Sequence, residues 1–246
     1  LLGRAIARWT ALIKDHSATT PVKSLKASDA ALFHLTLVVG SDDETLSDRT
    51  NESYSLKVGA DGVATATSPS VYGALRALAS FSQLVEVTPA SLVVRGLPWA
   101  IEDAPRYTHR GILVDSSRHF LSLDVLKEHI DAMEWAKLSV LHWHIVDSQA
   151  FPFKGDAVPA LAQGAWSSHE TYSAADVSSI VAYAKDRAVR VMIEVDTPGH
   201  SAAWGVGVPD VIPDCPGIDG GRIALDPTRN ETYATVEALL GELGTL

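Results

Sequence analysis

Cysteine is nearly absent from this chain, since Cys215 is the only one among 246 residues. A single cysteine cannot form a disulfide within the chain. Basic residues are also scarce, with 20 Lys and Arg against 30 Asp and Glu, which gives a net charge of −10. This balance argues against the basic clustering that a nucleic-acid-binding surface needs, so we expect no nucleic-acid partner.

Long apolar runs are missing as well. No run reaches the roughly 20 residues that a membrane-spanning helix needs, so we expect no membrane span. The start, Leu1-Leu2-Gly3-Arg4, has neither an initiator methionine nor the features of a signal peptide, so we expect a mature or partial product. The 46% of hydrophobic and 20% of charged residues are ordinary for a globular protein and provide enough apolar mass for one large domain or two smaller ones.

The first 105 residues mix helical and strand patterns. Apolar spacing predicts a helix over 1–13, a strand over 31–39, a hairpin, a helix over 70–87 and two short strands within 92–101. The hairpin consists of residues 54–58 and 63–67 around Gly59-Ala60-Asp61-Gly62. Because this half has no cluster of acids, histidines or cysteines, we expect residues 1–105 to form a supporting α+β domain.

After Pro105 the pattern changes to strand, helix, strand, helix. Apolar stretches predict strands over 112–114, 139–146 and 189–195. Each is followed by a helical pattern, the second opened by a capping box at Ser173–Asp176 and the third by an N-cap at Asp226. Three βα units in a row predict a parallel sheet with right-handed crossovers over residues 106–246.

Polar side chains gather just after these strands, where α/β sheets and barrels keep their active sites. The candidates are Arg118, His119, His144, Asp147, Glu194, Asp196 and His200. His142 and His144 are two residues apart, so both point to one face of their strand, with Trp143 on the other. We expect His142 to be a core histidine with a satisfied partner rather than a ligand.

Three motifs carry a family resemblance. RGILVDSSRH (residues 110–119), LHWHIVD (141–147) and EVDTPGH (194–200) resemble glycoside hydrolase family 20, the β-N-acetylhexosaminidases that include the lysosomal hexosaminidases. In the first half, YGALR (72–76) and FSQL (81–84) resemble a helix of the domain that precedes the barrel in that family. The resemblance covers nearly the whole chain.

The resemblance implies a fold. Residues 1–105 would be a zincin-like α+β domain, and residues 106–246 the first three βα units of a (β/α)8 TIM barrel. A full barrel needs on the order of 250 residues, and only about half that number follows Pro105. We therefore expect an N-terminal fragment with an incomplete barrel.

The resemblance also assigns roles to single residues. Arg118 would clamp hydroxyls of the terminal sugar, because a planar guanidinium donates in a fork. Asp147 and His200 match the paired Asp and His that support the catalytic glutamate. These two follow neighbouring strands, so we expect them to meet across a spacing of about 4.8 Å plus the reach of the loops. His144 and Glu194 match positions that buttress the site.

The activity implied is removal of terminal non-reducing N-acetylhexosamine, GlcNAc or GalNAc, from glycoconjugates. In family 20, an exception to the two-carboxylate scheme, the 2-acetamido oxygen of the substrate attacks C1 while a glutamic acid protonates the leaving oxygen. An adjacent aspartate orients the acetamido group. That Asp-Glu pair, which follows a Gly-Gly in the family, is missing from these 246 residues. We therefore expect the chain to be inactive alone, and we expect no cofactor and no metal.

Two other functions stay open. A metal-dependent, amidohydrolase-like enzyme would use His142 and His144 as a His-x-His pair, with Asp147 and His200 as further ligands. Metal content would distinguish this enzyme from a glycosidase. A non-catalytic carbohydrate-binding protein is the second alternative, and sequence beyond Leu246 would decide it.

The resemblance implies the secretory pathway, with a lysosomal or extracellular destination. Two sequons, at Asn51 and Asn230, are candidate glycosylation sites. In lysosomal relatives the cysteine that matches Cys215 pairs with one beyond the fourth strand. The resemblance leaves open a homo- or heterodimer, and the partner it implies is a glycan that ends in N-acetylhexosamine.

Overall fold

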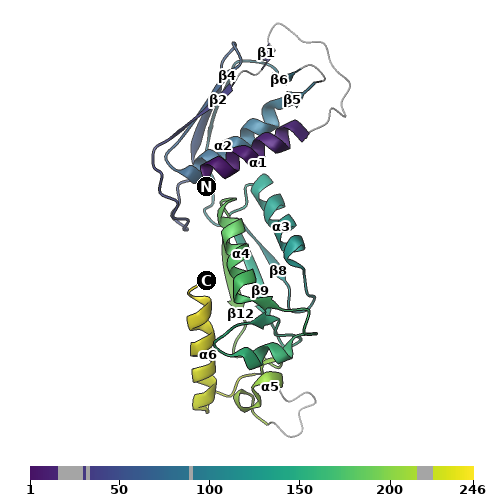
Figure 1. The fold of residues 1–246 in the computed structure, drawn as a ribbon. Coiled ribbons are helices and arrows are strands. Elements are labelled where there is room, and N and C mark those ends of the chain that lie inside the picture. The colour runs from purple at the N-terminus through teal and green to yellow at the C-terminus, as the bar shows by residue number, and fades with distance from the viewer. Residues whose placement is uncertain (16–29, 32–33, 89–90, 215–223) are drawn as a thin grey trace. The chain divides into compact units, whose positions relative to one another are not determined.

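The computed structural model describes residues 1–15, 30–31, 34–88, 91–214 and 224–246, which form two compact units (Figure 1). Unit 1 comprises Leu1–Arg110, Met133–Ser139 and Lys185–Ala188, and unit 2 comprises Gly111–Ala132, Val140–Ala184 and Val189–Leu246. Both contain helices and strands, so the fold is α/β. Cys215 lies outside the described residues. The predicted division at residue 105 stays a prediction.

Unit 1 is built on a four-stranded sheet in the order β2-β4-β3-β7. β3 pairs antiparallel with β4 and with β7, whereas β2 pairs parallel with β4. The predicted hairpin is therefore confirmed. The strands of this sheet are β2 (His34–Val39), β3 (Tyr54–Val58), β4 (Val63–Ser68) and β7 (Trp99–Asp103).

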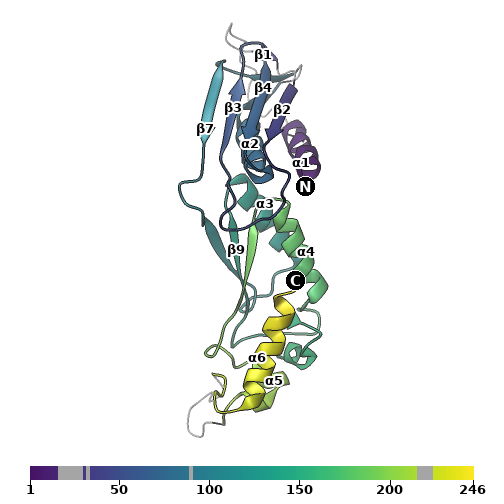
Figure 2. The ribbon, with the colours of Figure 1, turned by 90° about the vertical axis from the view of Figure 1, so that its left-hand side faces the viewer.

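Two helices pack beside this sheet, α1 (Leu2–Asp15) and α2 (Val71–Leu84). α2 contacts β2, β3 and β4, and α1 contacts α2 (Figure 2). Tyr72 and Leu75 of α2 form an apolar cluster with Trp9 of α1. Burial of such side chains is the main favourable contribution to folding.

A smaller antiparallel sheet, β1-β6-β5, also belongs to unit 1. Its strands are β1 (Ala30–Ala31), β5 (Val85–Val87) and β6 (Leu92–Val94). The prediction of a helix over 70–87 is wrong at its end, because α2 stops at Leu84 and Val85–Val87 pairs with β6. Valine has one strongly preferred rotamer in a helix and packs well in a strand, which favours this outcome.

Unit 2 contains the predicted parallel sheet, in the order β12-β9-β8. Its strands are β8 (Gly111–Asp115), β9 (Val140–Val146) and β12 (Arg190–Val195). α3 (Leu123–Trp135) follows β8 along the chain and α4 (Ala174–Lys185) follows β9, and both helices lie on one face of the sheet (Figure 2). Val114 and Trp143 are buried, and the Trp143 indole N–H donates to Ser116 Oγ at 2.8 Å.

Two rows of side chains toward the carboxyl ends of the strands lie on the other face of this sheet. One row holds Leu113, His142 and Met192, and the other holds Asp115, His144 and Glu194. Leu113 is 55% exposed and Met192 is 44% exposed. Apolar side chains of a parallel sheet are normally covered on both faces, so the part of this face around Leu113 and Met192 is an unpartnered surface within the described residues.

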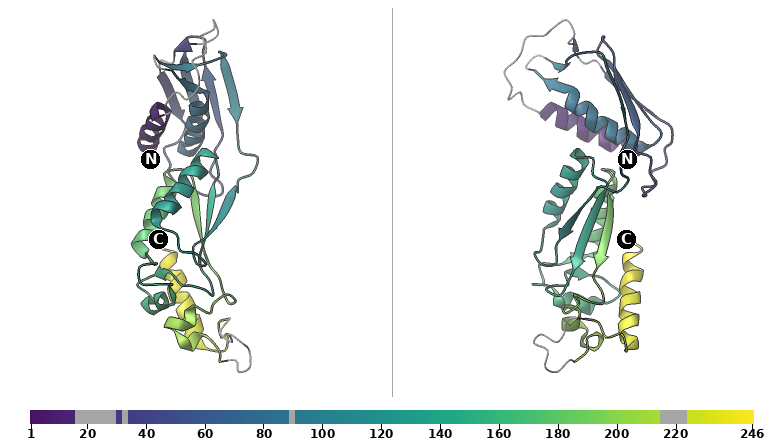
Figure 3. Two further views of the ribbon diagram at one scale, coloured as in Figure 1. Left: turned by 90° about the vertical axis from the view of Figure 1, so that its right-hand side faces the viewer. Right: turned by 180° about the vertical axis from the view of Figure 1, so that it is seen from behind.

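Shorter elements and a last helix complete unit 2. They are β10 (Phe153–Lys154), η1 (Pro159–Gly164), β11 (Tyr172–Ser173), α5 (Trp204–Gly207), η2 (Pro209–Val211) and α6 (Asn230–Leu243). Figure 3 shows α6, in yellow, as the last helix before the C-terminus. None of the described helices combines the length and the apolar character that crossing a membrane requires.

The helix starts in unit 2 were predicted with mixed success. The capping box of α4 is confirmed, because Asp176 N donates to Ser173 Oγ at 3.1 Å and Ser173 N donates to Asp176 Oδ2 at 2.9 Å. The N-cap at Asp226 is wrong, since α6 begins at Asn230. Asp226 Oδ1 instead accepts from Thr228 N at 2.9 Å, which closes a turn before the helix.

Gly73 in the first turn of α2 marks a close approach of the backbone to its neighbours. A Cβ at this position would collide with Ser68 Oγ and with the carbonyl oxygen of Ser53. Ser68 Oγ donates to that carbonyl at 2.9 Å, so neither atom can move freely. Glycine is therefore required by packing here, although it weakens a helix by about 1 kcal/mol relative to alanine.

We predict that Gly73→Ala destabilises the protein by about 1–3 kcal/mol, because overpacking outweighs the gain in helix propensity. Gly3→Ala in α1 is the matched control, since a Cβ at Gly3 has nothing within 4 Å. The control should leave the urea midpoint unchanged or raise it slightly. A rise of the midpoint for Gly73→Ala would contradict the close approach.

Candidate active site

The site forms where the three strands of unit 2 end. In the sheet register Asp115 on β8 lies beside His144 on β9, which lies beside Glu194 on β12. Asp147 follows β9, and the segment 196–200 follows β12. The carboxyl ends of parallel strands meet at one edge, so side chains from three separate stretches of sequence come together.

Asp147 is the centre of this arrangement. Its side chain is 1% exposed, and its Oδ2 atom faces three nitrogen groups. Arg118 Nη2 lies 2.7 Å away, His144 Nε2 2.9 Å and His200 Nδ1 3.2 Å. The other oxygen, Oδ1, accepts from Ser148 N at 2.6 Å. A buried carboxylate needs such donors, because it is costly to bury without them. The structure thus brings together the predicted partners Asp147 and His200.

Arg118 is held along its whole guanidinium edge. Besides Asp147 it contacts Asp115, where Nη1 lies 2.7 Å from Oδ2, and its Nε donates to Gln149 Oε1 at 2.9 Å. Asp115 Oδ1 also accepts from the backbone N–H groups of Ser117 and Arg118, each at 3.0 Å. The hydrogen bond to Asp115 raises the pKa of Arg118. Burial alone would raise the pKa of Asp115, but bonds from Arg118 outweigh burial and lower it.

His144 and Glu194 form a second pair on the same sheet face. His144 Nδ1 lies 2.9 Å from Glu194 Oε2, and His142 Nε2 contacts the same oxygen. His144 therefore faces a carboxylate with each ring nitrogen, which suits the doubly protonated imidazolium. Burial alone would lower the pKa of His144, but hydrogen bonds to Glu194 and Asp147 outweigh it and raise the pKa. Burial alone would raise the pKa of Glu194, but the two histidines lower it.

His200 reaches the site from a constrained loop. Its side chain is 61% exposed, and its Nδ1 atom contacts Asp196 Oδ2 at 2.8 Å in addition to Asp147. Its φ of 53° lies in the left-handed region, where residues other than glycine are uncommon. The next residue, Ser201, is fully buried and donates through Oγ to the carbonyl of Gly199 at 2.8 Å. This bond fixes the loop that presents the imidazole.

The predicted residues do not all join the site. His119 is exposed, and its Nδ1 contacts only the carbonyl oxygen of Arg118 at 3.0 Å among the interactions described for it. His142 has the expected partner in Glu194, but it is half-buried, so the prediction of a core position is wrong. The sequons are exposed at Asn51 in unit 1 and at Asn230 in unit 2, and their use stays a prediction.

Sequence reasoning missed two partners of Arg118. Asp115 ends β8 within the RGILVDSSRH motif, so its position at a strand end was the available signal. Gln149 lies 31 residues from Arg118 in sequence, and nothing in the local pattern pointed to its contact with Nε.

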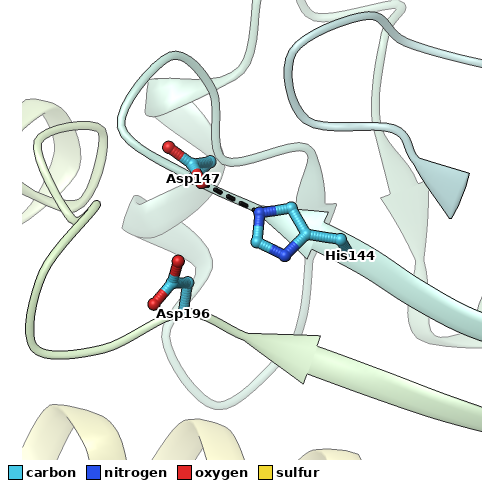
Figure 4. A group of neighbouring side chains, drawn as sticks. All are labelled: His144, Asp147 and Asp196. Carbon is cyan, nitrogen blue, oxygen red and sulfur yellow. Dashed lines mark hydrogen bonds and ion pairs between the residues drawn. The ribbon is translucent and has the colours of Figure 1, made fainter. Parts of the chain in front are cut away.

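Three groups lie close enough to be considered as metal ligands. Ligand atoms of His144, Asp147 and Asp196 all lie within 4.8 Å of one another (Figure 4). However, both His144 nitrogens face carboxylates, and Asp147 Oδ2 also faces the guanidinium of Arg118. A cation would have to compete with a fixed positive charge for that oxygen.

The amidohydrolase-like ligand set is not favoured either. Its His-x-His pair, His142 and His144, turns toward the single carboxylate of Glu194 rather than toward a shared open position. A metal-bound histidine instead directs a lone pair at the ion and donates its other N–H outward. The donor set therefore fits a hydrogen-bonded network better than a metal centre.

Comparison with known protein families agrees with this geometry. Residues 107–246, more than half of the chain, match the model of the glycosyl hydrolase family 20 catalytic domain. The chain belongs to glycosyl hydrolase family 20. Residues 5–84 match a second model, described as beta-acetyl hexosaminidase like.

Individual family 20 relatives align along most of the chain. Beta-hexosaminidase 1 of Arabidopsis thaliana is 40% identical over 256 residues, which cover 99% of this chain and 47% of that protein. Beta-hexosaminidase subunit beta of Homo sapiens is 38% identical over 198 residues, which cover 78% of this chain and 35% of that protein. The chain thus spans about half the length, or less, of these family 20 relatives.

Solved family 20 structures have the same fold. A mutant Streptomyces plicatus beta-hexosaminidase in complex with its product GlcNAc matches with a TM-score of 0.77 and 25% identity, over 98% of this chain and 50% of that one. A Flavobacterium johnsoniae chitobiase matches with a TM-score of 0.76 and 28% identity, over 98% of this chain and 37% of that one.

The Glu194–His144 pair predicts a pH-dependent stability. The folded pKa of His144 is raised above 6.5, so its contribution is complete below pH 6.5 and is lost as pH rises through the folded value. The folded pKa of Glu194 is lowered below 4.5, so its contribution is complete above pH 4.5 and is lost as pH falls through the folded value. Both contributions are complete between pH 4.5 and 6.5.

We predict that Glu194→Gln lowers the pKa of His144, measured by NMR titration, and that its loss of unfolding free energy is largest between pH 4.5 and 6.5. The loss should shrink at higher pH, where His144 is neutral in both proteins. Glu237→Gln, an equal change of charge at an exposed residue of α6, is the control and should show no such window. A loss that is independent of pH would contradict the ion pair.

Proposed function

We propose that the whole protein that contains this chain is a β-N-acetylhexosaminidase, which removes terminal non-reducing GlcNAc or GalNAc from glycoconjugates. The observation that carries this proposal is the convergence of Arg118, His144 and His200 on the buried carboxylate of Asp147, within a family 20 catalytic domain. The relatives named above are beta-hexosaminidases, and one solved structure holds GlcNAc as its product.

Arg118 is proposed to bind the terminal sugar. Its Nε, Nη1 and Nη2 atoms each contact one oxygen, of Gln149, Asp115 and Asp147 respectively. Each Nη atom carries two N–H groups, so one on each remains for a ligand oxygen as far as the described residues show. The side chain is partly exposed, which allows a sugar to reach it. Two parallel donors from a fixed plane suit a pair of vicinal hydroxyl oxygens.

Asp147 and His200 are proposed as positioning residues for a general acid. The carboxylate of Asp147, together with that of Asp196, orients the imidazole of His200. In the family 20 mechanism, a glutamic acid protonates the leaving oxygen while the acetamido oxygen of the substrate attacks C1. His200 is exposed enough to contact such an acid. His144 contacts Asp147 through Nε2, and Glu194 fixes the orientation of His144 through its Nδ1.

Unit 2 is proposed to be the first part of a (β/α)8 barrel, and unit 1 the zincin-like domain that accompanies it. The parallel order β12-β9-β8, the helices on one face and the exposed Leu113 and Met192 on the other support this proposal. Further parallel strands beside β8 and β12 would cover that face.

The setting of the enzyme is also a proposal. Several relatives are named as subunits, which supports a homo- or heterodimer. We propose the secretory pathway, with a lysosomal or extracellular destination, and the exposed sequons at Asn51 and Asn230 are compatible with it. The partner proposed is a glycan that ends in N-acetylhexosamine.

The function is tested with chromogenic glycosides. The whole protein should hydrolyse an N-acetylglucosaminide or N-acetylgalactosaminide but not the matching glucoside, which lacks the attacking acetamido group. A polypeptide of these 246 residues alone should be at least about 100-fold slower, because general acid catalysis contributes 10²–10⁴-fold. Absence of turnover by the whole protein would overturn the function. Equal turnover by the 246-residue polypeptide would overturn only the placement of the acid.

Asp147→Asn in the whole enzyme should lower kcat roughly 10- to 100-fold, as removal of an orienting partner does, and should move the pH–rate profile. KM should change little. The double variant with His200→Ala should be little slower than the slower single variant, because groups that act as a unit are not additive. Asp156→Asn, at an exposed residue of unit 2, controls for the loss of charge. Additive losses with an unmoved pH profile would show that the two residues act separately.

A further inference from the structure

A small cavity in unit 1 has charged walls and lies outside the active site. Its volume is about 170 Å³. Six of its lining residues carry polar or charged groups: Glu52, Tyr54, Arg76, Asp103, Arg110 and Lys137. All of them belong to unit 1.

Arg76 is the least expected residue in this wall. Its side chain is 2% exposed. Its Nε donates to Glu52 Oε2 at 2.6 Å, and its Nη2 donates to the carbonyl oxygens of Leu138 and Ala188 at 3.0 and 2.8 Å. The Nη1 atom is buried and has no hydrogen-bond partner among the described residues. Buried side-chain donors nearly always have a partner, so this atom needs a water molecule or a bound ligand that the described residues do not supply.

The carboxylates of the cavity are already engaged. Glu52 Oε2 accepts from Arg76 and, at 2.7 Å, from Arg110 Nη2. Asp103 Oδ2 accepts from Lys137 Nζ at 3.0 Å and from the Tyr54 hydroxyl at 2.6 Å. Both carboxylates are thus already bonded to other donors, and neither is a hydrogen-bond partner of Arg76 Nη1.

The charges in the wall do not balance. Arg76, Arg110 and Lys137 are cations, whereas Glu52 and Asp103 supply two negative charges. Burial raises the pKa of Tyr54, so its phenol stays neutral and adds no negative charge. The lining therefore holds one cation more than it holds carboxylates. The carboxylate of Glu134 also acts on Arg76, but it contacts Arg8 at 2.6 Å and lies 3.8 Å from Arg187. A water molecule would accept a hydrogen bond from Arg76 without correcting this excess.

We propose that this cavity binds a small monovalent anion, a halide or a small carboxylate, against Nη1 of Arg76. Both kinds of ligand accept from a guanidinium and bring one negative charge. The cavity has room for them, since a water molecule occupies about 30 Å³ of liquid volume. Because the anion binds only the folded form, it stabilises unit 1 and makes the unfolding temperature depend on anion concentration.

The proposal is tested first on the unfolding of the whole protein at constant ionic strength. Chloride, bromide, formate or acetate replaces gluconate, a monovalent anion too bulky to enter. The unfolding midpoint should rise by a few degrees and saturate. A response to the halides alone or to the carboxylates alone identifies the source. A midpoint that is the same in all the salts overturns the proposal.

A carboxylate introduced by substitution at the edge of the cavity tests whether the anion binds there. Ala104 is exposed and lines the cavity, so Ala104→Asp places a negative charge at its edge and should abolish the dependence on the anion. Ala100→Asp, at an exposed residue of β7 outside the lining, is the matched control and should keep it. An equal dependence in the two variants means that the anion binds elsewhere and overturns the proposal.

Crystals of the whole protein grown in sodium bromide give a direct readout. An anomalous peak within contact distance of Arg76 Nη1 is expected if halides bind, and electron density for a carboxylate is expected from formate if only carboxylates bind. Water alone at Nη1 under both conditions overturns the proposal.

Discussion

Unit 2 depends on the compensation of one buried charge. The carboxylate of Asp147 is excluded from water, and an ionised group in that position is tolerated only when donors surround it. The donors come from three separate strands or the loops after them: Arg118 after β8, His144 within β9 and His200 after β12. No single stretch of sequence can satisfy Asp147. The parallel order of the strands is therefore a condition for the site, and the site in turn links the loops that follow the strands.

Much of this architecture could be predicted from local patterns. The apolar stretches of β8, β9 and β12 were recognisable because buried parallel strands are apolar nearly throughout. The capping box of α4 was recognisable because two side chains three residues apart bond to each other's backbone. The candidate site followed from the positions of polar residues at strand ends, and the motifs supplied the family.

Predictions failed where a tertiary contact decided between local alternatives. Val85 continues the apolar stripe of α2, yet it pairs with Val94 of the small sheet, and no helical period reveals that partner. Aspartate is favoured both at an N-cap and in a turn. In this structure Asp226 forms a turn, because its Oδ1 accepts from the backbone N–H of Thr228. The contact of Gln149 with Arg118 depends on how the loop after β9 folds back, which has no period in the sequence.

The left-handed backbone conformation of His200 restricts the residue types that can replace this histidine during evolution. Among residues with a side chain, asparagine, aspartate and histidine adopt that conformation most readily, and glycine does so without strain, whereas a β-branched residue would be a genuine outlier. A lineage that no longer needs the imidazole can therefore replace it with asparagine or glycine and keep the loop. The conformation of the loop can thus be conserved after the histidine has been replaced, so the fold can persist in a protein that has lost the activity.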